Sequence, residues 1–455
     1  MNTLIAITGL GILVLLLEIF NLRKAIVPLT LLGLAGAFGV NAMEYGETAG
    51  YFSNMVVTSP YSSAFSGLFI ILTIFLVAMS RDFYSMEPGK LSDFVSIKVF
   101  LCAGAIAMVS FGNLAMFFLG IEVLSISIYI LAASDRLNIR SNEAGMKYFL
   151  MGSFASGVIL FGICLIYGAT GFFDIAEIYE LSKSEIIPNW FFIGLILMAA
   201  GMLFKIAAVP FHFWAPDVYE GAPALTTATM STLAKVASMA ALFKIASTLN
   251  ANVSVPFEYM IATIAMLSMI VGNIMALRQQ NVKRMLGFSG ISHAGYMLLV
   301  MFALSTSADT LLYYASAYAL AGIAAFAVVL YVYKTTQRED IDAFAGLGKT
   351  SPFLAAILTG ALISMAGIPI FSGFFAKFML FNQAIEGGYL AVVIVAVVSS
   401  IISIGYYFKI IIAMYMREPE SPSQPVPFAF HAVAFTALAL NLAIGLFPSL
   451  VMQLL

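Results

Sequence analysis

Long apolar segments recur along almost the whole chain, and they constrain its fold more than any other feature. Each has about the length, roughly 20 residues, that crosses the hydrocarbon core of a bilayer as a helix. Backbone groups in hydrocarbon must be hydrogen-bonded internally, so the segments predict a helical bundle and not a barrel. They lie at about residues 3–20, 26–43, 61–80, 95–111, 114–132, 146–168, 190–215, 223–248, 255–276, 285–304, 310–333, 352–381, 389–415 and 428–452. The sequence therefore predicts an all-α polytopic membrane protein with about fourteen transmembrane helices.

The composition agrees with a lipid environment. Of 455 residues, 62% are hydrophobic and 10% are charged, whereas about 25% are charged in a soluble domain. The formal net charge of −2 and the lack of any basic run exclude nucleic acid as a partner. Cys102 and Cys164 lie in apolar runs without the spacing of a metal site, and the sequence contains no cofactor-binding motif.

The positions of the basic residues orient the predicted helices. Cytoplasmic loops of membrane proteins are enriched in lysine and arginine. If the N-terminus is outside, Lys183 is the one basic residue in an outer loop, and thirteen others fall in cytoplasmic loops. These thirteen are Arg23, Lys24, Arg81, Lys90, Arg136, Arg140, Arg278, Lys283, Arg284, Lys334, Arg338, Lys349 and Arg417. With an even number of spans, we expect both termini on the outer side.

The remaining seven basic residues are all lysines within spans or at their edges. They are Lys98, Lys147, Lys205, Lys235, Lys244, Lys377 and Lys409. A desolvated lysine can lose its proton, whereas arginine stays charged, so the choice of lysine indicates groups that exchange protons. Lys98 and Lys244 lie near span ends, where a long side chain can reach the interface. Lys244 is also a candidate proton relay. Lys147 and Lys409 fit either a structural role or a place on a proton path.

Glu122, in the fifth span, is the only carboxylate expected so deep in the membrane. Each charge at a helix centre costs about 2.5–3.5 kcal/mol on insertion scales, so Glu122, Lys205, Lys235 and Lys377 together cost on the order of 10–14 kcal/mol. That is comparable with the net stability of a domain, about 5–15 kcal/mol. A structural ion pair is the alternative, but apolar residues often stabilise a core equally well. We interpret the four residues as a proton path.

Two histidines are candidates for proton relays, because the unperturbed imidazole pKa is about 6.5. His293 lies in the tenth span beside Ser289 and Ser292, and His212 lies in the seventh span. A packing role is the alternative for both, and it is the favoured interpretation for His431.

Proline interrupts two spans. Pro210 in the seventh span and Pro369 in the twelfth each remove a backbone donor and break the helix. The two spans are five apart, so five-helix units at residues 95–248 and 255–415 would cross the membrane in opposite directions. Inverted repeats with broken helices are typical of transporters, and the breaks lie near the translocation path. Residues 1–94 would then form three N-terminal helices, and residues 428–455 the last helix.

Three blocks of sequence resemble the proton-translocating, antiporter-like membrane subunits of respiratory complex I, the NADH:quinone oxidoreductase. The similarity runs over almost the entire chain. The blocks are residues 205–223 (KIAAVPFHFWAPDVYEGAP) with 228–235 (ATMSTLAK), residues 283–296 (KRMLGFSGISHAGY) and residues 367–377 (GIPIFSGFFAK).

The resemblance implies roles for single residues. Glu122 and Lys205 would form a charge pair, Lys235 would be the central lysine and Lys377 the terminal one, while Lys147 also matches a lysine of the family. Lysine at 377 distinguishes the chain from subunit M, which carries an acid there. The expected end directly after the last span distinguishes it from subunit L, which has a long lateral helix.

The resemblance also implies an activity as part of a redox-driven proton pump. When quinone chemistry elsewhere perturbs the row of charges, Glu122 and Lys205 would pair or separate. Pairing would favour the protonated lysine, and separation would push its proton to Lys235 and then toward Lys377 and the outside.

Partners and location follow from the same resemblance. The chain would hold no cofactor itself, and NADH, FMN, iron–sulfur clusters and quinone would belong to partner subunits. The expected partners are other membrane-arm subunits, including subunits K and M, and through them the peripheral NADH-oxidising arm. The membrane would be the bacterial inner membrane, with both termini periplasmic. Two alternatives are a subunit of an Mrp-type cation/proton antiporter, which shares the core, and a membrane scaffold without transport activity.

Overall fold

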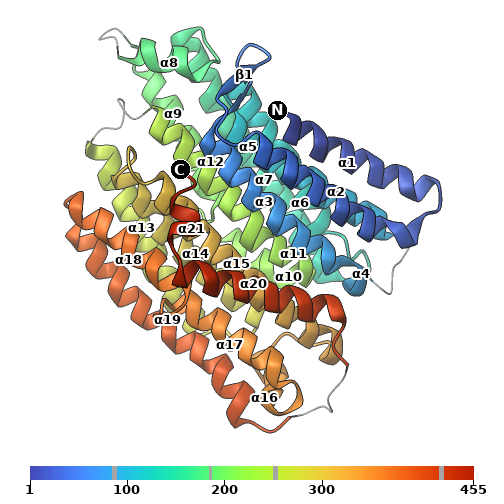
Figure 1. Ribbon diagram of the computed structural model, residues 1–455. Helices are drawn as coiled ribbons and strands as arrows, with labels where there is room; N and C mark the ends of the chain where they lie inside the picture. The colour runs from blue at the N-terminus through green and yellow to red at the C-terminus, as the bar shows by residue number, and fades with distance from the viewer. Residues whose placement is uncertain (85–89, 184–186, 250–254, 420–424) are drawn as a thin grey trace.

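The computed structural model describes residues 1–84, 90–183, 187–249, 255–419 and 425–455, and it confirms the all-α membrane fold (Figure 1). In these residues eleven helices are long and apolar enough to cross a membrane. They contain α1 (Asn2–Ile19), α2 (Ile26–Met43), α3 (Pro60–Ala78), α5 (Leu91–Ser110), α6 (Leu114–Ala132), α7 (Ile139–Thr170), α13 (Val255–Leu277), α14 (Val282–Met297), α15 (Ala308–Thr336), α19 (Leu390–Met416) and α20 (Phe428–Leu446).

The other three predicted spans coincide with helices that are not regular. The seventh is broken into α9 (Trp190–Lys205) and α10 (Trp214–Gly221), and the twelfth into α17 (Pro352–Ala366) and α18 (Ser372–Glu386). The eighth consists of α11 (Ala224–Thr229), a π-helical turn η3 (Met230–Ala234) and α12 (Lys235–Thr248). The breaks follow from Pro210 and Pro369, whose rings cannot continue the helical hydrogen bonds. The sequence did not predict the π-helical turn.

Short elements lie between the long helices. An antiparallel hairpin of β1 (Ala49–Tyr51) and β2 (Val56–Thr58) is the only sheet in the described residues. The other short elements are η1 (Arg23–Ala25), α4 (Ser80–Phe83), α8 (Ile175–Ser182), η5 (Leu298–Phe302), η6 (Ile341–Phe344), α16 (Leu347–Thr350) and α21 (Ser449–Met452).

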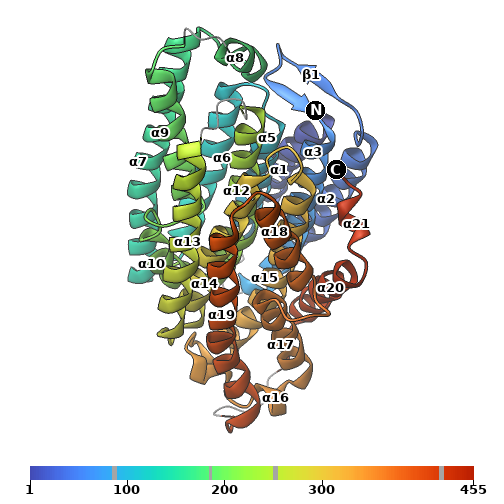
Figure 2. The same cartoon turned by 90° about the vertical axis from the view of Figure 1, so that its left-hand side faces the viewer.

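Helix α15 forms the centre of the bundle. Every residue of its most apolar stretch is buried, whereas only 33% of the corresponding stretch of α1 and of α2 is buried. In the two views of the fold α15 runs between the N-terminal and C-terminal helices, while α1 and α2 lie at the edge (Figures 1 and 2). The central helix therefore contacts both halves of the chain, including α3, α12, α17, α18 and α20.

The same local contacts occur at one end of α6 and at one end of α14. The side chain of Asn113 accepts a hydrogen bond from the backbone of Met116 and caps α6, and Asn281 caps α14 in the same way. Each asparagine also forms an isolated β-bridge to an aspartate, Asn113 to Asp174 and Asn281 to Asp340.

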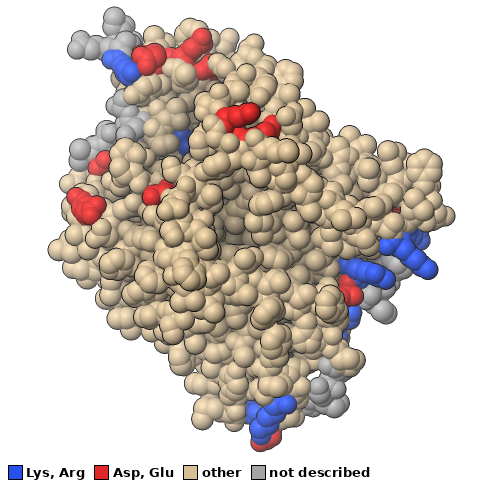
Figure 3. All heavy atoms as spheres, in the orientation of Figure 1, with Lys and Arg blue, Asp and Glu red and all other residues tan. Residues whose placement is uncertain are grey.

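Charged side chains gather at two opposite ends of the molecule (Figure 3). Acidic atoms lie near α8, which carries Glu177, and near the β1–β2 hairpin. Basic atoms lie near α4, which carries Arg81, and near α16, which carries Lys349. The surface between these ends is almost free of charge in this view, as expected for a face in contact with lipid.

Candidate functional site

Lys205 is the last residue of α9, directly before the break in the seventh span. Its ammonium group donates to Ser125 Oγ at 2.8 Å, to Ser156 Oγ at 3.1 Å and to Tyr129 Oη at 3.3 Å. The lysine is 8% exposed, so these contacts replace water around the charge. All three partners are neutral hydroxyl groups on α6 and α7.

The expected charge pair of Glu122 and Lys205 is not formed in the described structure. Glu122 precedes Ser125 by three residues on α6, and so faces the same side of the helix one turn away. Its Oε1 atom is buried and has no hydrogen-bond partner in the described residues. Lys205 donates to Ser125 instead, one turn along α6 from Glu122.

Lys235 follows the π-helical turn η3 and begins α12. Its ammonium donates to the carbonyl oxygen of Gly290 on α14 at 2.6 Å and lies 5.9 Å from the centre of the Tyr219 ring. A Cβ atom at position 290 would lie 2.7 Å from the lysine nitrogen, so glycine is what allows this contact. Single π-helical turns occur frequently at functional sites, because they displace one side chain relative to a regular helix.

His293 lies on α14, one turn after Gly290, and contacts hydroxyl groups at both ring nitrogens. Its Nδ1 atom lies 2.7 Å from Tyr314 Oη, and its Nε2 atom lies 3.4 Å from Tyr407 Oη. Tyr407 Oη in turn lies 2.5 Å from Ser289 Oγ. The imidazole therefore belongs to a connected set of groups that can both donate and accept protons.

Lys377 lies on α18, just beyond the break in the twelfth span. Its ammonium donates to the carbonyl of Ala366, the last residue of α17, and to Ser400 Oγ on α19, both at 2.9 Å. It lies 4.8 Å from the centre of the Tyr296 ring. The chain between α17 and α18 starts at Gly367, whose φ of +83° favours glycine.

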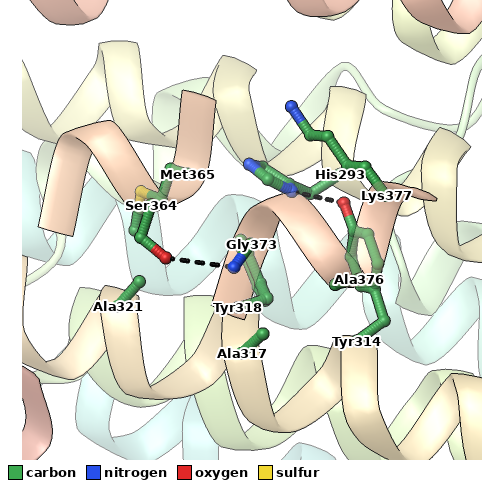
Figure 4. A pocket seen from close by; sticks show the side chains of 10 residues that line it. All are labelled: His293, Tyr314, Ala317, Tyr318, Ala321, Ser364, Met365, Gly373, Ala376 and Lys377. Atoms are coloured by element: carbon green, nitrogen blue, oxygen red, sulfur yellow. Dashed lines mark hydrogen bonds between the residues drawn. The ribbon is translucent and has the colours of Figure 1, made fainter. Parts of the chain in front are cut away.

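A small pocket connects His293 with Lys377 (Figure 4). It has room for about one water molecule. Its polar lining consists of His293, Tyr314, Tyr318, Ser364 and Lys377. In Figure 4 the imidazole and the Lys377 side chain lie at the same side of the pocket, and Ser364 lies across it.

Aromatic rings connect the surroundings of Lys205 with those of Lys235. The ring of Tyr129 lies 4.9 Å from that of Tyr148, which stacks on Trp214 at 4.4 Å. Trp214 lies 6.4 Å from Tyr219, the ring next to Lys235.

Two other predicted relay lysines bind backbone carbonyls at helix ends. Lys244 donates to the carbonyls of Val109 and Phe111 at the end of α5, at 2.7 and 2.6 Å. Lys409 donates to the carbonyl of Leu277 at the end of α13. Cations are favourable at these positions because the last carbonyls of a helix lack partners and carry partial negative charge.

The remaining candidates lie apart from the buried lysines. Lys147, with 42% of its side chain exposed, forms ion pairs with Glu143 at 2.7 Å and Asp217 at 3.3 Å. His212 is buried in the break of the seventh span, lies against Phe213 with its ring tilted, and has no partner at Nδ1 in the described structure.

Several lysine and arginine positions differ from the expectation. Lys98 is 1% exposed and donates to Ser80 Oγ at 2.9 Å, so it does not extend to the interface. Lys283 and Arg284 lie in the first turn of α14 and not in a loop. The Lys283 side chain is only 3% exposed and pairs with Glu339 at 2.6 Å. Periodicity could not reveal this buried pair, because its two members are far apart in the sequence.

The neutral partners of the lysines were not predicted from the sequence. These are Ser125, Ser156, Ser400, Tyr129 and the backbone carbonyls of Gly290 and Ala366. Their one sequence signal is the presence of hydroxyl residues inside apolar segments, which is too common to single them out. Within the described residues there is no group of three or more His, Cys, Asp or Glu side chains that could hold a metal ion.

The chain is similar to known membrane proteins over almost its whole length. Residues 112–403 match the family described as NADH:quinone oxidoreductase/Mrp antiporter, transmembrane. NADH-quinone oxidoreductase subunit N of Flavobacterium johnsoniae is 67% identical, and the alignment covers 100% of both chains. A chain in respiratory complex I from Thermus thermophilus with bound aureothin has a TM-score of 0.87 and 31% identity, with 99% of this chain and 98% of that chain covered.

A chain of the Mrp complex from Dietzia sp. DQ12-45-1b is also similar in structure. Its TM-score is 0.85 at 21% identity, with 99% of this chain and 94% of that chain covered. At this level of identity the likeness concerns the fold alone.

Proposed function

The chain belongs to the NADH:quinone oxidoreductase/Mrp antiporter transmembrane family, and we propose that its buried lysines carry protons through the membrane arm of an NADH-quinone oxidoreductase. It is a proton-translocating, multi-pass membrane subunit of that enzyme, as the resemblance in the sequence predicted. Relatives named subunit N agree with the lysine at position 377, which already argued against subunit M.

One observation carries the proposed path. Lys205, Lys235 and Lys377 are 8%, 2% and 5% exposed, and each donates to neutral oxygen atoms only. None forms an ion pair in the described part of the chain. A buried ammonium without a counter-charge contributes little to stability, because its desolvation is not offset by Coulomb attraction. Its neutral form needs no counter-charge, and proton transfer is therefore the function that explains all three.

The proposed order of transfer follows the positions of the groups. Lys205 receives or releases a proton according to its distance from Glu122, and Lys235 accepts that proton at the Gly290 carbonyl. His293 lies on the same helix as Gly290 and lines the pocket that reaches Lys377. A water molecule in this pocket would connect imidazole and ammonium.

The lack of an ion pair between Glu122 and Lys205 in the described residues supports a switch between two arrangements. The lysine now bonds Ser125, one turn from the carboxylate. A change of its rotamer toward Glu122 would form the ion pair and favour the charged lysine. Return to the hydroxyl groups would favour release of the proton.

Two sets of matching contacts support the inverted five-helix repeats at residues 95–248 and 255–415. Lys244 of the eighth span binds carbonyls at the end of the fourth, and Lys409 of the thirteenth binds a carbonyl at the end of the ninth. The caps and bridges of Asn113 and Asn281 match in the same way. In this arrangement each repeat contributes one broken helix, interrupted at Pro210 or Pro369.

The orientation and the partners follow from the charge distribution and the relatives. The end of the molecule with α4 and α16 is basic, which supports its placement on the cytoplasmic side of the inner membrane, with both termini periplasmic. Partner subunits of the membrane arm bind this chain, and we infer that they include subunits K and M, with the peripheral arm beyond them. NADH, FMN, iron–sulfur clusters and quinone belong to those partners in this proposal.

Lys235→Ala tests the path in the assembled enzyme. We expect loss of NADH-driven proton uptake by inverted membrane vesicles, with the enzyme still assembled. Lys349→Ala is the matched control, because that lysine is exposed and pairs with Glu418 at the surface. Normal proton uptake per NADH oxidised in the Lys235→Ala enzyme would overturn the proposed path.

A further inference from the structure

The last long helix, α20, packs directly on the break of the twelfth span. Asn441 of α20 is completely buried. Its amide nitrogen donates to the carbonyl of Ala317 on α15 at 2.8 Å, and its amide oxygen accepts from Ser364 Oγ of α17 at 2.9 Å. Because a carbonyl can only accept, the Ala317 contact fixes which end of the amide faces Ser364.

Gly445, one turn further along α20, contacts the chain between α17 and α18. A Cβ atom at this position would lie 2.6 Å from the backbone nitrogen of Ser372 and 2.7 Å from the carbonyl oxygen of Ile370. Only glycine allows this approach without displacement of the backbone. Asn441 and Gly445 therefore form one contact surface, the α20 clasp, against both sides of the break.

Ser364 links the clasp to the helix that carries Lys377. Its Oγ atom donates to Asn441 and accepts from the backbone N–H of Gly373 at 3.4 Å, the contact drawn in Figure 4. A Cβ atom on Gly373 would lie 1.9 Å from the carbonyl oxygen of Ser364, so α17 and α18 touch through their backbones here. Lys377 follows Gly373 by four residues and so lies one turn away on the same side of α18.

We propose that Asn441 is a positioning residue for proton transfer through Lys377. Together with Gly445 it holds the end of α17 and the start of α18 at the distance at which Lys377 reaches the carbonyl of Ala366. The helix that does this lies outside both five-helix repeats. The inference rests on the proposed role of Lys377. If Lys377 did not carry protons, the position that the α20 clasp gives it would not affect proton transfer.

Removal of the amide should disturb the lysine through a defined chain of contacts. Without Asn441, the buried Ser364 hydroxyl loses its acceptor and the Ala317 carbonyl loses one of its donors, which is unfavourable for buried polar groups. Ser364 then has reason to turn toward another acceptor and release Gly373. The start of α18, and Lys377 with it, would lose its fixed position relative to Ala366.

The test uses the assembled enzyme in inverted membrane vesicles and compares proton uptake with NADH oxidation. Asn441→Leu has a similar volume but no polar atoms, and we expect it to lose most of its proton uptake per NADH oxidised. Asn441→Asp can donate to the Ala317 carbonyl only while its carboxyl group is protonated. Its proton uptake per NADH should therefore recover, relative to the native chain, as the pH is lowered. Thr436→Val is the control, because Thr436 is an exposed residue of α20 that bonds only within its own helix.

Lys377→Met, measured in parallel, separates the two proposals. If Lys377→Met abolishes proton uptake and Asn441→Leu pumps normally, the positioning role of Asn441 is wrong and the proton path through Lys377 is still supported. If Lys377→Met itself pumps normally, the proposed path fails. Should Asn441→Leu not assemble, the pH profile of Asn441→Asp decides: a profile identical to that of the native chain would overturn the positioning role.

Discussion

The ammonium group of Lys377 donates a hydrogen bond of 2.9 Å to the carbonyl oxygen of Ala366. These two residues lie on opposite sides of the break, since Ala366 ends α17 and Lys377 lies in α18. A helix end carries unpaired carbonyls and partial negative charge, so it is a favourable partner for a cation without being a full counter-charge. The end of α17 thus stabilises the charged form of Lys377. Because it is not a full counter-charge, the lysine can still lose its proton.

Lys377→Arg should abolish proton pumping although it keeps the positive charge. Guanidinium stays protonated under all conditions of the enzyme, so it can occupy the Ala366 site but cannot pass a proton on. The measurement is NADH-driven proton uptake together with enzyme content, and Lys377→Met serves as the comparison without charge. If only a fixed charge mattered, Lys377→Arg would pump and Lys377→Met would not.

Gly290→Ala should slow pumping and leave folding nearly unchanged. The added Cβ would lie 2.7 Å from the Lys235 nitrogen, and the flexible lysine would move away from its carbonyl acceptor. A hydrogen bond from a charged group contributes about 1.5–3 kcal/mol, so loss of this contact corresponds to an effect on the order of tenfold or more. The rate of proton uptake per NADH measures it.

Gly157→Ala on α7 is the control for that change, because a Cβ there would meet no atom within 4 Å. The same substitution in an open position should leave both pumping and the melting temperature as they are. Equal rates for Gly290→Ala and Gly157→Ala would show that the Lys235–Gly290 contact has no role in transfer.

Most of the fold could be predicted from the sequence, because membrane insertion gives a direct signal. Apolar length located the eleven described helices that are long enough to cross a membrane, and Pro210 and Pro369 located both breaks. The π-helical turn before Lys235 could not be predicted, because it depends on how Met230–Ala234 pack and not on a helix-breaking residue. The prediction for Lys98 was wrong for a related reason. Its position along the helix indicates how deep it lies in the membrane, but its burial depends on a neighbouring helix, α4, whose Ser80 accepts its hydrogen bond.

Lys244→Met should lower stability and leave pumping per NADH unchanged. The lysine binds two carbonyls at the end of α5, which favours a role as a cap over its predicted role as a relay. Loss of a charged cap at a helix C-terminus costs about 1–2 kcal/mol. A lower melting temperature of the purified enzyme with a normal ratio of protons to NADH is the expected result, and a lower ratio would return Lys244 to the path.

The stability contribution of Asp340 should disappear in acid. Burial raises the pKa of this carboxyl group, but hydrogen bonds from Arg338 outweigh it and leave the pKa below its usual value. A lowered pKa in the folded state means that the stabilisation is present above the unfolded value, about 3.9, and is lost as the pH falls through the folded value. Asp340→Asn should therefore lower the melting temperature at pH 7 and have a smaller effect near pH 3.

The size of that effect is limited by solvent. The Asp340 and Arg338 side chains are 34% and 46% exposed, so the ion pair contributes no more than about 1 kcal/mol. Arg338→Gln should reproduce the loss at pH 7, since it removes the same pair. A difference between Asp340→Asn and the native chain that is equally large at both pH values would exclude the ionised carboxylate as its cause.

The residues of the candidate site were predicted from their charge, but the contacts between them could not be predicted. Charged residues in apolar segments are rare, so Glu122, Lys205, Lys235 and Lys377 were identified from type and position alone. Their contacts depend on side chains from other spans, and single-sequence patterns carry no information on such pairs. Glu122 and Lys205, assigned to one pair from the sequence, form no ion pair in the described residues, and the lysine donates to the Ser125 hydroxyl instead.

Ser125→Ala should therefore shift Lys205 toward Glu122 and slow the release of its proton. The hydroxyl at 2.8 Å is the shortest of the three contacts of the ammonium group, and Glu122 Oε1 lies one turn away without a hydrogen-bond partner in the described residues. Loss of one hydrogen bond to a charged group changes the balance between the two positions by about 1.5–3 kcal/mol, a factor on the order of ten or more. We expect slower proton uptake at normal enzyme content, and recovery in Ser125→Thr, which restores the hydroxyl.

The double variant Ser125→Ala with Glu122→Gln separates the causes: if the carboxylate captures the lysine, the serine substitution has little further effect once Glu122 is neutral. An equal effect of Ser125→Ala in both backgrounds would mean that the hydroxyl acts independently of Glu122.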